Sequence, residues 1–115
     1  MIIDFNELLI MSNFFNVLKQ AQDLKGKVSE LKHKLENTNF VGKDDEEQVE
    51  VIVSGKGILL DLDISPECLG DSSLLKKKIR EAYNNAKVEA DGFSKEEINK
   101  VTGGIPLPFD LKSFF

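Results

Sequence analysis

The amino-acid sequence predicts a small α+β protein in which two helices flank a three-stranded antiparallel sheet. Between residues 48 and 64 aliphatic residues recur at every second position, as expected for two strands of a hairpin with one buried face. Residues 14–35 and 71–101 instead place apolar residues three or four positions apart, which is the spacing of a helix. Since a lone hairpin is not stable in water, another element must cover its apolar face.

The hairpin pattern also predicts how its two strands pair. The residues of the shared face are Val49, Val51 and Val53 in the first strand and Ile58, Leu60, Leu62 and Ile64 in the second. They lie on one face only if the connecting turn has an even number of residues, so we expect Gly55-Lys56 or residues 54–57. A three-residue loop is rejected because it would set valine against aspartate. The pairs expected on the outer face are Ile52 with Leu59 and Glu50 with Asp61.

The first helix is predicted to begin at Ser12 or Asn13, whose side chains are suited to cap a helix N-terminus. Its heptad seam consists of Phe14, Val17, Ala21, Leu24, Val28, Leu31 and Leu35. The seam fits a helix packed along its own sheet or a helix that also meets a partner helix. Because lysines surround a narrow seam, we favour an element that projects from the body. A close helix crossing is one reason for Gly26, which costs up to ~1 kcal/mol relative to alanine.

The remaining strand boundaries follow from residues that interrupt regular structure. The first helix should end at residues 37–39, and residues 39–42 are a short strand candidate that makes the sheet three-stranded. Ser65-Pro66 should end the last strand, because proline cannot donate to the ladder.

The second helix should begin between Asp71 and Ser73, where oxygen-bearing side chains are available as caps. We expect it to weaken at Gly92 and Ser94 and to resume over residues 95–101. Gly103-Gly104 should then end it.

Three segments are predicted along the chain: residues 1–10 as an N-terminal extension, residues 11–104 as the domain, and residues 105–115 as a tail. Translation is expected to start at Met1 or at Met11, and the sequence does not distinguish the two. The tail, IPLPFDLKSFF, holds two prolines and three phenylalanines, so it should be extended and should pack on something.

The formal net charge of −5 and the pI near 4.9 argue at first sight against a polyanionic partner. The charges are segregated, however, with one lysine and five acids in residues 43–50, and with five lysines in residues 19–34. Residues 76–80 form a second basic cluster. Because local potential decides what docks where, such a protein can still bind a polyanion, weakly and with strong salt dependence.

Several features favour the cytoplasm. The chain has no apolar run long enough to span a membrane, so we expect no membrane association. Asp4 and Glu7 stand where a signal peptide would carry basic residues. The single cysteine, Cys68, cannot form an internal disulfide, which fits a reducing compartment.

No residue pattern points to catalysis, so we expect no catalytic residue, metal site, cofactor or small-molecule substrate. His33 lies among lysines and fits a solvated helix residue, and Cys68 has no second ligand nearby. Gly55-Lys56-Gly57 lacks the rest of a phosphate-loop pattern and fits a hairpin turn. The carboxylates of Glu50, Asp61 and Asp63 fit a solvated acidic face of the sheet better than an acid-base pair.

The sequence also resembles the YbaB/EbfC family of nucleoid-associated proteins, through short motifs in collinear order between Met11 and about Phe109. These are Lys19-Gln20-Ala21-Gln22, Val41-Gly42, residues 49–55, Ile64-Ser65-Pro66, residues 82–86 and Val101-Thr102-Gly103-Gly104 followed by Pro106 and Pro108. The resemblance implies a bacterial protein with a helix, a three-stranded antiparallel sheet and a helix. It also implies a tight homodimer with projecting helices that binds double-stranded DNA.

We therefore expect a non-enzymatic, homodimeric protein of the cytoplasm and nucleoid that binds double-stranded DNA mainly through its phosphates. The residues expected to contact DNA are Lys19, Gln20, Gln22, Lys25, Lys27, Lys32, Lys34, Lys76, Lys77, Lys78 and Arg80. Aromatic residues are not interleaved with the lysines, so stacking on single strands is not indicated. For residues 76–80, solvated charge at a helix end is the alternative. For the whole protein, the alternative is an adaptor or holdase that grips polypeptide with its seam and its tail.

Overall fold

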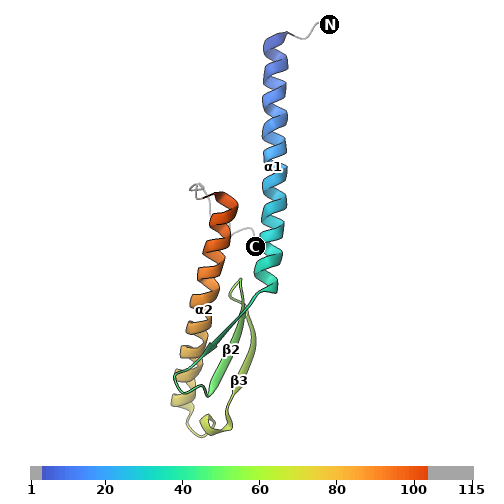
Figure 1. Ribbon diagram of the computed structural model, residues 1–115. Coiled ribbons are helices and arrows are strands. Elements are labelled where there is room, and N and C mark those ends of the chain that lie inside the picture. The colour runs from blue at the N-terminus through green and yellow to red at the C-terminus, as the bar shows by residue number, and fades with distance from the viewer. Residues whose placement is uncertain (1–3, 104–115) are drawn as a thin grey trace.

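The computed structural model describes residues 4–103, which form two long helices and a three-stranded sheet (Figure 1). The elements are α1 (Phe5–Asn37), β1 (Asn39–Lys43), β2 (Val49–Ser54), β3 (Leu59–Ile64), the short 3-10 helix η1 (Pro66–Cys68) and α2 (Ser72–Thr102). The strand order is β1-β2-β3, and both neighbouring pairs are antiparallel. The predicted α+β class, with the order helix, three antiparallel strands, helix, is confirmed.

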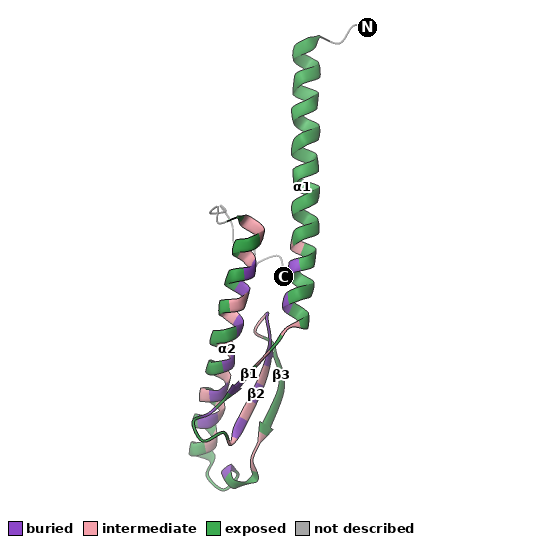
Figure 2. Cartoon of the chain, viewed as in Figure 1, coloured by how far each residue is buried: buried purple, intermediate pink, exposed green. Residues whose placement is uncertain are grey.

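The molecule is elongated because most of α1 projects away from the sheet (Figure 1). Its principal extents are 84 × 21 × 17 Å. Residues 4–27 are all exposed, and only the last turns of α1 reach buried positions, at Leu31 and Leu35 (Figure 2). The prediction of a projecting helix is therefore confirmed.

The core lies between the sheet and α2. It consists of Val49, Val51 and Val53 from β2 and Ala82, Ala86 and Ala90 from α2. The small alanines let the helix approach the sheet closely, and Gly42 of β1 lies at the closest point. A Cβ atom at Gly42 would stand 2.1 Å from the backbone oxygen of Ala82 and 2.4 Å from the backbone nitrogen of Ala86. Only glycine, which has no Cβ atom, therefore fits at this position without moving the helix.

The expectation that the apolar face of β3 is buried is wrong for the single chain. Ile58, Leu60 and Leu62 are 53%, 51% and 39% exposed, although the valines paired with this region are buried. The reason is geometric: a helix is about 10 Å wide, and strands are about 4.8 Å apart, so one helix covers about two strands. Because α2 packs over β1 and β2, β3 is left as an uncovered edge.

The predicted even-numbered turn is also wrong. Ser54 N–H donates to the Ile58 carbonyl at 2.9 Å, which closes a three-residue loop over residues 55–57. Gly57, with a φ of 83°, supplies the left-handed backbone conformation that this loop needs. Val53 pairs with Leu59 whereas Ile52 pairs with Asp61, so Leu60 is an extra, bulged residue.

The bulge restores the pairing of apolar residues that a three-residue loop alone would destroy. Val51 pairs with Leu62, and Val49 pairs with Ile64. The outer-face pairs are shifted, however, so that Glu50 meets Asp63, and Ile52 meets Asp61 in place of Leu59. The predicted Ile52–Leu59 and Glu50–Asp61 pairs are therefore wrong.

Helix α1 begins earlier than predicted. Asp4 is its N-cap, and Ser12 and Asn13 lie inside the helix. Serine and asparagine cost only a few tenths of a kcal/mol in an exposed helix, which does not outweigh the good helix formers in residues 7–11. The predicted boundary between residues 10 and 11 therefore lies within a continuous helix, and the division of the chain stays a prediction.

Helix α2 begins and ends where its caps were predicted. Asp71 is the N-cap and accepts a hydrogen bond from Leu74 N–H at 3.1 Å, and Gly103 adopts the left-handed conformation at the C-terminus. The expected weakening at Gly92 and Ser94 is absent, because α2 is continuous between residues 72 and 102 and Ser94 is buried within it. Gly104 and the tail, residues 105–115, lie outside the described residues.

Candidate nucleic-acid interface

The predicted DNA-binding residues of α1 lie on its exposed surface. These are Lys19, Gln20, Gln22, Lys25, Lys27, Lys32 and Lys34. Lys25 and Lys32 follow the seam residues Leu24 and Leu31, so they flank one side of the seam, and Lys27 and Lys34 flank the other. Lys19, Lys25, Lys27 and Lys32 form no ion pair with any residue between 4 and 103. Four cations on the projecting helix are therefore open to a ligand.

Lys34 differs from these four because it joins α1 to α2. Its Nζ atom lies 2.9 Å from Oε2 of Glu97, whose other oxygen is 2.9 Å from Nζ of Lys100. Lys100 first, and then Lys34, lower the pKa of Glu97 below its usual value. The Lys34 ammonium also lies 5.8 Å from the centre of the Phe93 ring. The ion pair therefore joins the two helices, while the Lys34 side chain stays 52% exposed.

The residues of the second predicted cluster, at the start of α2, lie on different faces of the helix. Lys76, Lys77 and Arg80 are exposed, whereas Lys78 is only 4% exposed. Because Lys78 precedes the buried Ala82 by four residues, it lies on the face of α2 that packs on the sheet. The structure thus removes Lys78 from the cations available for phosphate, contrary to our expectation.

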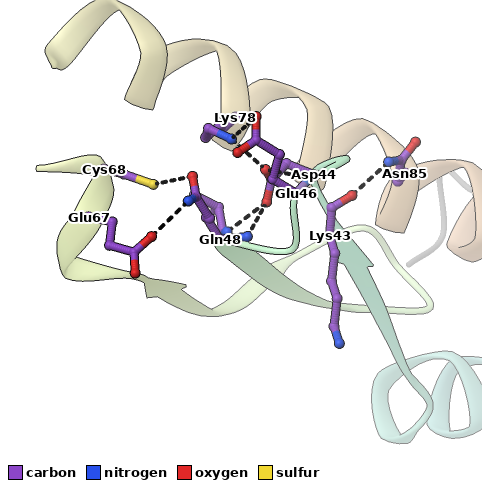
Figure 3. A network of polar contacts seen from close by, with 9 residues as sticks. Lys43, Asp44, Glu46, Gln48, Glu67, Cys68, Lys78 and Asn85 are labelled. Carbon is purple, nitrogen blue, oxygen red and sulfur yellow. Dashed lines mark hydrogen bonds and ion pairs between the residues drawn. The ribbon is translucent and has the colours of Figure 1, made fainter.

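Lys78 is held by Asp44, which lies between β1 and β2 (Figure 3). The Lys78 Nζ atom is 3.0 Å from Asp44 Oδ2. The carboxylate also accepts backbone N–H bonds from Val49 at 2.7 Å, from Gln48 at 2.8 Å and from Glu46 at 3.2 Å. Burial alone would raise the pKa of Asp44, but these N–H groups and Lys78 stabilise the carboxylate and lower the pKa to about 2.

The same network fixes the loop between β1 and β2 and the residues after β3 (Figure 3). Asn85 of α2 donates to the carbonyl of Lys43 at 2.8 Å. Gln48 donates to Glu67 at 3.1 Å and accepts a bond from the Cys68 thiol at 3.2 Å. Asp44 and these partners were not predicted as a unit. The acidic run was visible in the sequence, but nothing there singled out one aspartate as buried.

Acidic groups surround the second cluster. Oε1 of Glu46 lies 3.5 Å from the Lys78 ammonium. The pKa of Glu81 is raised, first by its hydrogen bond with the neighbouring carboxyl group of Asp45 and then by burial. An anion that approaches Lys77 therefore also meets Glu81 and, next to it, Asp45 of the β1–β2 loop, which weakens the attraction.

The structure does not bring the two basic clusters together within one chain. Lys34 pairs with Glu97 near the end of α2, whereas Lys78 lies near its beginning. The 19 residue steps from position 78 to position 97 span about 28 Å along the helix axis. Each cluster is therefore a separate patch.

Other predicted features can be placed in the described part of the chain. His33 is exposed on α1, and Cys68 is a buried free thiol. Between residues 4 and 103, no group of three histidine, cysteine, aspartate or glutamate side chains is arranged to hold a metal ion. No helix in that range is long and apolar enough to cross a membrane.

Fold and charge together define a small α+β module with a long, lysine-bearing helix. The family model of the YbaB/EbfC DNA-binding family matches residues 11–105. The chain belongs to the YbaB/EbfC DNA-binding family.

Two relatives of known name support this family assignment, and one solved structure supports the fold. A nucleoid-associated protein of Granulibacter bethesdensis is 35% identical over 104 residues, which cover 89% of this chain and 97% of that protein. A nucleoid-associated protein of Pelodictyon phaeoclathratiforme is 35% identical over 103 residues, covering 90% and 93%. An uncharacterized Helicobacter pylori protein of known structure shares the fold, with a TM-score of 0.71 and 22% identity over 89% of this chain and 100% of that one.

Proposed function

We propose that this protein binds double-stranded DNA as a homodimer, mainly through phosphate contacts, and that it takes part in nucleoid organisation or gene regulation in the bacterial cytoplasm. It acts without catalysis, cofactor or small-molecule substrate. The relatives named nucleoid-associated proteins support the location, and the family supports DNA as the partner.

One observation carries the DNA-binding proposal: four exposed lysines are distributed around α1. Lys19, Lys25, Lys27 and Lys32 are free of ion pairs with the rest of residues 4–103, so binding phosphate does not require breaking an existing contact. Phosphate contacts position a protein without reading sequence. Any preference would then come from DNA shape or from polar side chains such as Gln20 and Gln22.

The uncovered edge of the sheet supports the homodimer. Ile58, Leu59, Leu60 and Leu62 are 39–53% exposed in the single chain, and β3 is an edge strand. An apolar edge strand of this kind is normally covered or paired, because exposed it invites association. A second copy that covers β3 would also double the number of lysine-bearing helices.

A salt titration of DNA binding tests the proposal. Binding of a duplex of arbitrary sequence, measured by mobility shift, should weaken steeply as salt rises from about 50 to about 200 mM, since counterions are released from the phosphates. A second duplex of unrelated sequence should behave alike. Binding that is absent at low salt, or that is insensitive to salt, would overturn the proposal.

A second function is favoured by the apolar residues of the projecting helix. Phe14, Phe15 and Val17 are each 61% exposed, which suits an adaptor or holdase that grips polypeptide. Apolar binding is not weakened by added salt, so the same titration with an unfolded polypeptide in place of DNA distinguishes the two functions.

A further inference from the structure

The apolar seam of α1 is covered at one end and open at the other. Leu31 and Leu35 are 3% and 1% exposed. Further towards the N-terminus the same seam is uncovered, with Leu24 at 36% exposure and Val17 and Phe14 at 61% each. Something absent from residues 4–103 must cover this stretch if it is to leave water.

The open stretch begins where α2 ends. Val101, in the last turn of α2, lines a shallow cleft together with Lys27 and Leu31 of α1. Helix α2 ends at Thr102, whereas α1 continues for many turns beyond it (Figures 1 and 2). The seam therefore loses its cover at the point where the chain leaves α2.

The segment that follows α2 has the length and the pattern to continue this cover. Residues 104–115 number twelve, so they can reach about 40 Å when extended, whereas Leu24 and Phe14 are about 15 Å apart along α1. Ile105, Leu107, Phe109 and Leu111 recur at every second position. An extended chain would place them on one side, and the prolines between them favour extended backbone.

We propose that residues 105–111 of the same chain dock as an extended strip along the α1 seam between Leu24 and Phe14. The tail is attached to the end of α2, where the open part of the seam begins. This covalent attachment gives the tail an effective concentration in the millimolar range at the seam. A second copy of α1 fits the seam less well, since in a parallel, in-register pair Lys27 of each helix would approach Lys32 of the other. The docked tail covers the seam and leaves Lys19 open to DNA.

Disulfide trapping in the full-length protein tests the position of the tail. In a Cys68→Ser background, Val17→Cys combined with Phe109→Cys should oxidise rapidly to an intrachain disulfide. Lys19→Cys combined with Phe109→Cys is the control, because position 19 lies on the opposite side of α1 from position 17. Equal rates for the two pairs, or a covalent dimer in the Val17→Cys pair, would overturn the proposal.

Hydrogen exchange provides a second measurement that leaves the fold intact. Phe109→Ser should speed amide exchange in residues 14–24 several-fold while leaving residues 31–37 unchanged. Asp110→Asn, on the other side of an extended tail, should change neither. If Phe109→Ser leaves the exchange of residues 14–24 as it is in the unmodified protein, the tail does not dock there.

Discussion

The ammonium of Lys78 lies 3.0 Å from a carboxylate oxygen of Asp44, and both residues are at most 4% exposed. The pair joins the beginning of α2 to the loop between β1 and β2. It also takes one lysine out of the basic cluster at residues 76–80. A residue that the sequence offers as a DNA contact thus has a structural role.

Stability in acid should depend on Asp44. Its pKa is lowered from 3.8 to about 2 in the folded protein, so its carboxylate stabilises the fold above about pH 4, and this contribution is lost as the pH falls towards 2. Urea unfolding of Asp44→Asn between pH 7 and pH 2 should show a lower free energy at pH 7 and a shallower loss below pH 4. Asp63→Asn, at an exposed position, should follow the unmodified protein. Parallel curves for Asp44→Asn and the unmodified protein would contradict this role.

The close contact between β1 and α2 should not tolerate a methyl group. Gly42→Ala would force a Cβ against the backbone of Ala82 and Ala86, which cannot yield easily. We expect a loss of about 3 kcal/mol in the free energy of unfolding. Gly26→Ala is the matched control, because nothing lies within 4 Å of a Cβ at Gly26 in the single chain.

Gly26→Ala should raise stability by about 0.5–1 kcal/mol, since alanine is the better residue in a helix interior. Chemical denaturation of both variants makes the comparison. A loss of stability in Gly26→Ala would mean that another chain approaches this position, as a close helix crossing would require.

The edge strand β3 should carry the homodimer contact. Leu62→Asp places a charge on a residue that is 39% exposed in the single chain, so the monomer should tolerate it but a dimer should not. Sedimentation velocity at micromolar concentration should show a dimer for the unmodified protein and a monomer for the variant. Val88→Asp, at a 71% exposed position on the outer face of α2, should remain dimeric. A stable folded monomer in the unmodified protein would rule out an obligate dimer.

Removal of residues 1–10 should leave the domain stable. Phe5, Leu8 and Ile10 are 71%, 55% and 67% exposed, so within the described residues they contribute little burial. A chain that starts at Met11 should therefore keep its melting temperature and its oligomeric state. A drop of several degrees would show that another chain, or the tail, buries this end of α1.

Local patterns in the sequence predicted the elements but not the contacts between distant ones. Alternation located β2 and β3, and Asp71 and Gly103 marked the ends of α2. The bulge at Leu60 was missed, because a parity argument assumes a constant register along the hairpin. The burial of Lys78 was missed because its partner, Asp44, lies 34 residues away, and no local pattern connects the two.

The α1 lysines should dominate DNA binding over those of α2. Changing Lys25, Lys27 and Lys32 together to glutamine removes three exposed charges per subunit without breaking an ion pair within the described residues. Changing Lys76, Lys77 and Arg80 to glutamine should have a smaller effect, because the carboxylates of the β1–β2 loop already offset that cluster. Glu50→Gln should change neither affinity nor salt dependence, and exposed changes of this kind usually alter stability by less than about 0.5 kcal/mol.

The most direct measurement is the slope of the logarithm of DNA affinity against the logarithm of salt concentration for the Lys25, Lys27 and Lys32 triple variant. We expect the slope to become shallower by about 0.9 for each phosphate that the variant dimer no longer neutralises, and the affinity to fall by a similar factor for unrelated duplexes. A triple variant that binds DNA with the affinity and slope of the unmodified protein would contradict a phosphate-binding surface on α1.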